Sequence, residues 1–209
     1  MAYLLYIEAS PRKDRSNSIA VAKSFIETYR ENHNNDRIAT IDLWHTPLPE
    51  FNGEVINAKY AIYHGREFTQ AQEQAWDAVE NIIAQFIGAD KYLFSLPMWN
   101  FGIPYKLKQY IDVIVQPGYT FSFTPEEGYK GLLTGKPVAA VYSRGSAYGT
   151  DSGMESYDQQ KTYLETILGF IGLSDFQTIV VEETLGPAEV KDKSLQAARK
   201  LAQKIAAGF

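Results

Sequence analysis

The sequence predicts an α/β fold in which a parallel sheet of five strands, ordered 2-1-3-4-5, carries helices on both of its faces. Two observations lead to this prediction. Short runs of β-forming residues alternate along the chain with longer segments whose apolar residues recur at helical spacing. The first run, Tyr3–Ile7, is apolar throughout, which is typical of a strand that is buried on both faces.

Each expected strand is a short run that ends at a polar or turn-forming segment. The five strands are expected at Tyr3–Ile7, Arg37–Leu43, Tyr92–Leu96, Val138–Tyr142 and Phe176–Val181. We find no internal repeat, low-complexity tract or linker between them. The chain is therefore expected to form a single domain over residues 1–209.

The expected helices lie between these strands. The first follows residues 10–18 and presents its apolar residues from Ile19 to Ile26 at helical spacing. The second begins at Thr69 as its N-cap and reaches about Ile87, where Gly88 stops it. The others are expected at Tyr105–Gln116, near Asp158–Gly169, and from a first turn containing Pro187 to Ala206.

Two segments depart from this alternation. Residues 44–68 contain Pro47, Pro49 and Gly53 and are expected to be irregular, with a short helix near Val55–Tyr60. Residues 118–133 carry aromatic residues at alternating positions, which predicts a short hairpin or extended flap. These aromatic residues are Tyr119, Phe121 and Phe123.

Composition excludes several classes of function. The net charge of −5 argues against general binding to nucleic acid or anionic lipid. The absence of cysteine excludes disulfides, thiolate metal sites and thiol nucleophiles. We find no signal peptide and no stretch near the roughly 20 apolar residues of a membrane span, so the expected location is the cytoplasm.

Three loops are expected to lie at one edge of the predicted sheet. In sheets of this order, ligands bind beyond the carboxyl ends of the strands, near the point where the strand order reverses. That rule selects the loops after the first, third and fourth strands, which are residues 10–18, 97–104 and 143–150.

The first loop, SPRKDRSNS, has the chemistry of a phosphate-binding turn. The first-turn N–H groups of the following helix lack intrahelical partners and carry partial positive charge, which suits a phosphate monoester. The residues expected around it are Ser10, Ser16, Asn17 and Ser18. Arg12 and Arg15 either add charge or point into solvent. The alternative is simple capping of the helix by Ser16 or Asn17.

The second loop, PMWNFGIP, is unusually apolar for a segment with two prolines and a glycine. Its candidate residues are Pro97, Met98, Trp99, Asn100 and Phe101. An isoalloxazine ring is flat, with an apolar end and a polar end. Backbone amides and Asn100 suit its polar edge, and the large apolar side chains suit packing on the ring. Gly102 is expected to allow close backbone approach or a positive φ. The alternative assigns the aromatic residues to the core or to an interface.

The third loop begins with Ser143, Arg144, Gly145 and Ser146. These residues offer a hydroxyl, a guanidinium and a flexible backbone that could border the polar rim of the ring. Many strands end in such a turn, so the prediction depends on all three loops converging.

Together these stretches resemble the FMN-dependent NADH-azoreductase and NAD(P)H:quinone reductase family of flavodoxin-like proteins. The matching stretches are SPR…SNS at 10–18, PMWNFGIP at 97–104, GYTFSFT at 118–124, GLLTGK at 131–136, SRGS at 143–146 and LGFIGL at 168–173. They run in family order and at family spacing over essentially the whole chain. The family's third loop more often reads SRGG, and Ser146 would be strained if its position needed a positive φ.

The resemblance implies FMN as the cofactor. Its phosphate end would lie at Ser10 and Ser16–Ser18, its ring along Met98–Phe101 and its rim near Ser143–Ser146. The resemblance also implies a homodimer with the active site at the subunit boundary, where the aromatic flap covers the flavin or shapes the substrate slot. The implied reaction is ping-pong: NAD(P)H passes a hydride to flavin N5, and a quinone or azo compound then takes the electrons.

No side chain is expected to act as an obligatory acid, base or nucleophile, and no metal site is expected. His33, His45 and His64 are expected at the surface, and the pairs Glu126–Glu127 and Glu182–Glu183 are expected to be solvated charge. Two alternatives stay open. One is a flavodoxin-like electron carrier without a substrate of its own, and the other is a regulatory or scaffold protein with a vestigial site.

Overall fold

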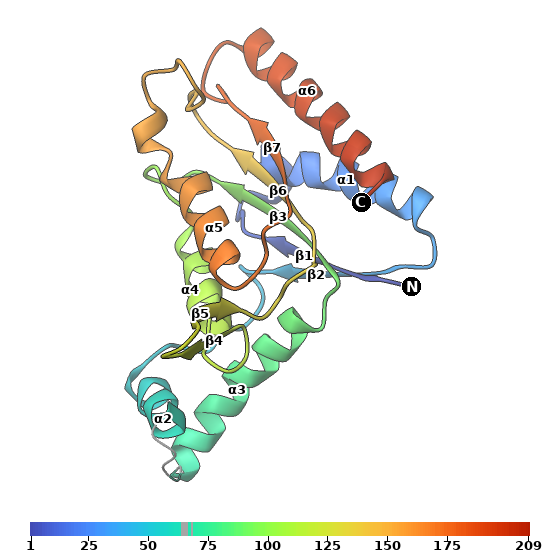
Figure 1. Ribbon diagram of the computed structural model, residues 1–209. Coiled ribbons are helices and arrows are strands. Elements are labelled where there is room, and N and C mark those ends of the chain that lie inside the picture. Colours follow the sequence, from blue (N-terminus) through green and yellow to red (C-terminus); the bar gives the residue numbers. More distant parts are fainter. Residues whose placement is uncertain (64–66, 68) are drawn as a thin grey trace.

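The computed structural model describes residues 1–63, 67 and 69–209, and within this part of the chain five strands form one parallel sheet. The strands are β1 (Tyr3–Glu8), β2 (Arg37–Asp42), β3 (Lys91–Pro97), β6 (Val138–Ser143) and β7 (Phe176–Val181). Their order is β2-β1-β3-β6-β7, which reads 2-1-3-4-5 when these five are numbered along the chain (Figure 1). The predicted order is therefore confirmed.

The strands are aligned so that their carboxyl ends lie at the same edge of the sheet. Glu8 of β1 pairs with Ser95 of β3, and Pro97 of β3 pairs with Ser143 of β6. Since parallel strands all leave the sheet on the same side, the loops after β1, β3 and β6 begin next to one another.

Helices cover both faces of the sheet. The helices α1 (Asn17–Asn32) and α6 (Ala188–Ala207) pack on one face, and α4 (Tyr105–Ile114) and α5 (Gln159–Phe170) pack on the other, joined by the end of α3 (Gln70–Ile87) (Figure 1). Alternating strand residues supply the two cores, with Leu4 and Tyr6 in one and Leu5 and Ile7 in the other. No helix of the described residues is long and apolar enough to cross a membrane.

Helix ends follow local signals. Thr69 forms the predicted N-cap of α3 in a reciprocal capping box with Gln72, and Gly88 is its C-cap. The predicted end of α4 at Gln116 is wrong, because the helix stops at Ile114; Pro117 disfavours helical backbone in the residue before it. Pro187 is the N-cap of α6 and lies just outside the first turn where it was predicted.

The insertion after β2 contains more regular structure than its sequence indicates. A helix, α2 (Gly53–Tyr63), extends well beyond the predicted short helix, and the Asn52 side chain accepts hydrogen bonds from the N–H groups of Glu54 and Val55 at its start. Val55 and Ala58 are buried with Trp76 of α3, so packing between α2 and α3 stabilises this helix. The last part of the insertion, residues 64–66 and 68, lies outside the described residues and includes His64.

The predicted hairpin is present as β4 (Phe121–Thr124) and β5 (Gly128–Gly131). Its base crosses the end of α5 at very short range. A Cβ atom on Gly131 would lie 2.3 Å from the backbone N of Gly172, and Gly172 has a φ of +103°. The N–H of Leu133 also donates to the carbonyl of Ile171 at 2.9 Å. Two glycines are therefore required where these two backbones meet.

Replacing Gly131 with alanine is expected to lower the free energy of unfolding by about 1–3 kcal/mol, because the added methyl group meets backbone atoms that cannot move aside. Urea denaturation measures the difference. Gly169→Ala is the matched control, since that position lies in α5 with nothing within 4 Å of the added Cβ. An equal loss in both variants would contradict the close crossing.

Candidate functional site

Backbone hydrogen bonds at the strand ends place the starts of the three predicted loops side by side at the carboxyl edge of the sheet (Figure 1). The N–H of Ala9 donates to the carbonyl of Ser95 at 2.9 Å, and the N–H of Met98 donates to the carbonyl of Ser143 at 2.7 Å. Residues far apart in the sequence, among them Ser10, Met98 and Ser143, therefore begin one continuous rim.

The first loop presents three buried hydroxyl groups at the start of α1. Ser10, Ser16 and Ser18 are all buried, and the Ser16 and Ser18 hydroxyl oxygens lie 3.1 Å apart. Ser16 accepts a hydrogen bond from the N–H of Ile19, so Ser16 caps α1 as the alternative prediction stated. Asn17 is half-buried, and Arg12 and Arg15 are exposed at the same helix start. Capping and anion binding are compatible, because one cap satisfies only one of the free N–H groups.

A charged cluster supports this loop from the ends of β1 and β2. Lys13, whose φ is +48°, donates to Glu8 at 2.7 Å and also to Asp42, and His45 Nδ1 lies 2.7 Å from Asp42. Burial raises the pKa of Asp42, but the hydrogen bonds from Lys13 and His45 outweigh it and leave that pKa below its usual range. This cluster was not predicted from the sequence, although two acidic residues at the ends of neighbouring strands are a signal for it.

The second loop contains a two-residue turn between Trp99 and Gly102. The two residues exchange backbone hydrogen bonds of 3.0 and 2.9 Å, and between them Asn100 and Phe101 have φ values of +48° and +68°. Positive φ at both central positions is the pattern of a type I′ turn. Gly102 was expected to allow close backbone approach or a positive φ; the positive φ is absent there, because the left-handed positions are Asn100 and Phe101.

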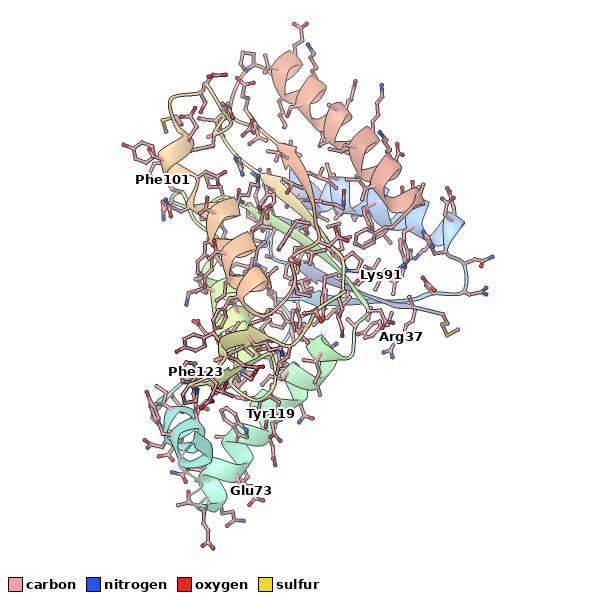
Figure 2. The ribbon with its side chains drawn as sticks, viewed as in Figure 1. Arg37, Glu73, Lys91, Phe101, Tyr119 and Phe123 are labelled. Carbon is pink, nitrogen blue, oxygen red and sulfur yellow. The ribbon has the colours of Figure 1, made fainter. Side chains whose placement is uncertain are left out.

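The aromatic side chains of this loop stand at the surface and outside the apolar clusters of the core. Phe101 is 41% exposed, and its ring centroid lies 5.0 Å from that of Tyr157 and 6.3 Å from that of Tyr148. Figure 2 shows it on the opposite side of the molecule from Lys91 and Arg37. Trp99 and Met98 are half-buried, and Trp99 packs against Trp44 with centroids 5.7 Å apart. A phenyl ring in the left-handed region costs about 1–3 kcal/mol, which points to a function for this turn.

The third loop does not present its arginine to the rim. Arg144 is only 3% exposed, and its guanidinium contacts Asp158, Gln160 and Glu182 inside the protein. Gly145 lies against Leu185, where an added Cβ would approach the leucine side chain to 2.8 Å. Ser146 is exposed and outside the left-handed region, so the strain considered for it is absent.

Glu182 and two histidines have surroundings that can be compared with what the sequence predicts for them. The expectation that Glu182 is solvated charge is wrong, because it pairs with the buried Arg144 at 3.2 Å. His33 is half-buried and stacks on Tyr29 at 4.4 Å, and exposed His45 is partnered by Asp42. In the part of the chain that the structure describes, no group of three or more His, Cys, Asp or Glu residues could hold a metal ion.

The aromatic hairpin is distant from the second loop of its own chain. Phe121 packs on Phe170, the last residue of α5, whereas Phe101 packs on Tyr157, just before the first residue of that helix. The length of α5, about 18 Å, separates the two contacts. In Figure 2, Phe101 lies well apart from Tyr119 and Phe123.

The rim therefore combines two kinds of binding group. One end offers hydroxyls, free N–H groups of a helix and two arginines, which suit a phosphate ester. The other offers a turn with Asn100, exposed Phe101 and half-buried Met98, which suit a flat ring with a polar edge. An aromatic group that carries a phosphate ester fits this donor set.

A five-stranded parallel sheet of this order, with its candidate site at the carboxyl edge, defines a flavodoxin-like α/β protein. The model of a family described as having a flavodoxin-like fold matches residues 2–205. The chain is 50% identical over 199 residues to a protein of Desulfotalea psychrophila named FMN-dependent NADH:quinone oxidoreductase, covering 95% of this chain and 93% of the relative.

Solved structures agree. An azoreductase from Bacillus anthracis superimposes with a TM-score of 0.92 at 29% identity, covering both chains completely. An FMN-dependent NADH-azoreductase from the same species, solved in complex with FMN, superimposes with a TM-score of 0.87 at 31% identity over 99% of this chain and 100% of the other. The chain belongs to the flavodoxin-like family that includes the FMN-dependent NADH:quinone oxidoreductases and azoreductases.

Asp42→Asn is expected to lower the free energy of unfolding by about 1 kcal/mol near neutral pH, because it removes the acceptor that Lys13 and His45 share. Since folding lowers the pKa of Asp42, its contribution is present above the unfolded pKa and is lost as the pH falls through the folded pKa. The two proteins should therefore converge in acid. Denaturation at about pH 7 and about pH 3 measures this, with Asp77→Asn on the exposed side of α3 as the control. A pH-independent difference would argue against the ion-pair cluster.

Proposed function

We propose that this chain is an FMN-dependent NAD(P)H oxidoreductase that reduces quinones and cleaves azo compounds to amines. The observation that carries the proposal is the convergence of the three loops, with an exposed phenyl ring held on a strained turn between them. The relatives and solved structures with FMN in their names support FMN as the cofactor. The chain acts in this proposal as a single FMN-binding domain.

In this proposal, the two ends of the rim bind different parts of the cofactor. Ser10 and Ser16–Ser18 would hold the phosphate, and the hydroxyl groups of the three serines are already buried there. Pro97–Phe101 support the ring, with the Asn100 amide at its polar edge. Ser143, Gly145 and Ser146 border the rim, and Arg144 supports their loop from inside the protein.

Bound FMN would supply two-electron redox chemistry between NAD(P)H and a quinone or azo compound. The chain's own residues bind and orient the reactants. Backbone N–H groups of the second and third loops would place partial positive charge near the part of the flavin on which negative charge collects. No side chain is assigned as an acid, base or nucleophile.

We further propose a homodimer whose subunit boundary forms the rest of the active site. The hairpin of one chain is too far from the second loop of that chain to line it, and it exposes Phe123 and Tyr129 beside an apolar hollow. In a dimer these aromatic residues cover the partner's site. A monomer mass by light scattering would remove this part of the proposal.

Asn100→Gly is expected to weaken FMN binding about fivefold, because it removes one hydrogen-bonding side chain while glycine keeps the left-handed backbone. Asn100→Leu should weaken binding further by adding strain at that φ. Fluorescence titration of the FMN-free protein measures the dissociation constants. An unchanged constant in Asn100→Gly would remove this amide from the cofactor site.

Kinetics separate the oxidoreductase from a flavodoxin-like electron carrier. The FMN-loaded protein is expected to oxidise NADH rapidly in stopped flow, whereas a carrier would be reduced slowly without a protein partner. Because nicotinamide and acceptor would use one place in turn, double-reciprocal plots at several quinone concentrations should be parallel. Intersecting lines would contradict the shared place, and slow reduction would favour the carrier.

A further inference from the structure

The Arg144 guanidinium is the centre of a buried polar cluster behind the candidate site. Its Nε donates to Gln160 Oε1 at 3.2 Å and its Nη1 to Glu182 Oε1 at 3.2 Å, while Nη2 lies 2.8 Å from Asp158 Oδ2. The Arg144 side chain is 2% exposed, so these contacts account for its charge within the protein. One cation therefore neutralises two carboxylates that come from different parts of the fold.

The same two carboxylates hold both ends of one loop, residues 148–158. At one end, Glu182 Oε1 also accepts a hydrogen bond from the N–H of Tyr148 at 3.0 Å. At the other end, Asp158 caps α5 by accepting from the N–H of Lys161 at 3.0 Å. Both anchors of the loop depend on side chains that Arg144 neutralises.

This anchored loop presents two tyrosines to the tip of the second loop. Tyr148 and Tyr157 lie at the two ends of the 148–158 loop, and both pack against Phe101. The ring centroid of Tyr157 is the nearer, at 5.0 Å from that of Phe101. Tyr157 is 48% exposed and Phe101 is 41% exposed, so the pair forms a wall at the surface instead of a buried core contact. The anchors thus determine where this aromatic wall stands beside the rim.

We propose that Tyr157, packed on Phe101, sets the size of acceptor that the site admits, and that Arg144 is the positioning residue that holds Tyr157 in place. The proposal rests on the oxidoreductase function proposed above. It assigns to the third-loop arginine a role in acceptor selection in place of direct contact with the cofactor.

Arginine suits this role better than lysine does. Its planar guanidinium reaches three partners at once from fixed directions, whereas an ammonium group is a single point of charge. A cavity of about 580 Å³, lined in part by Arg144, Tyr148, Asp158 and Glu182, lies beside the cluster. The 148–158 loop has room to shift into it once the guanidinium is lost.

The first test removes the aromatic ring of Tyr157. Tyr157→Ala is expected to raise the ratio of kcat/KM for a bulky acceptor (an anthraquinone) over that for a small one (1,4-benzoquinone) by about threefold or more, because removing the ring opens space at the rim. Tyr157→Phe keeps the ring and should keep the wild-type ratio. Leu201→Ala on α6 controls for loss of an exposed apolar side chain. A ratio within twofold of wild type in Tyr157→Ala would overturn the assignment.

The second test asks whether Arg144 acts through Tyr157. Arg144→Met should shift the acceptor ratio in the same direction as Tyr157→Ala, and the double variant should shift it no further than the larger single effect. Arg144→Lys should restore the ratio in part. A purely structural role would lower stability in urea without moving the ratio, and a large loss of FMN affinity in both Arg144 variants would indicate direct cofactor contact. Either result overturns the proposal.

If Arg144→Met does not fold, Asp158→Asn tests the same link, because asparagine still caps α5 but loses the charge that pairs with the guanidinium. It should move the ratio in the same direction, and an unchanged ratio counts against the proposal. Failure of the proposed function is distinguishable, since the wild-type protein would then fail to bind FMN or to oxidise NADH.

Discussion

The alignment of β1, β3 and β6 is the constraint on which the rest of the structure depends. Their hydrogen-bonded register places Glu8 beside Ser95 and Pro97 beside Ser143, so three loops begin at one edge. The apolar residues on both faces of these strands hold that register, because a slip by one residue would move each side chain into the opposite core, where it does not fit. The paired strands of the core therefore position the candidate site.

The sequence predicted the sheet, its order and the place of the three loops because each of these follows from local signals: apolar runs, helical spacing and the topology of parallel strands. It misplaced the strained positions of the second loop. A glycine was the natural choice for a positive φ, yet Asn100 and Phe101 take that conformation. It also misjudged Glu182, since nothing in the chain around that residue shows that Arg144, 38 residues away, lies within 3.2 Å.

The stretches that carry the family resemblance serve different physical purposes. PMWNFGIP and the serines of the first loop form the rim itself. GLLTGK and LGFIGL contribute Gly131 and Gly172, whose backbones approach too closely for any side chain and so tie the hairpin to the end of α5. Similarity in these last two stretches therefore reports on packing. Similarity in the loops concerns the rim, where the cofactor is proposed to bind, so the two groups of stretches support the family assignment in different ways.

The left-handed backbone conformation of Phe101 matters for any attempt to stabilise this protein. A conformation with φ of +68° suits glycine far better than phenylalanine, so selection for folding alone would exchange one for the other. The resulting chain would relax this strained turn and lose the aromatic surface that Phe101 now exposes beside the rim. In the proposed function, this one position therefore trades conformational stability for an exposed aromatic ring.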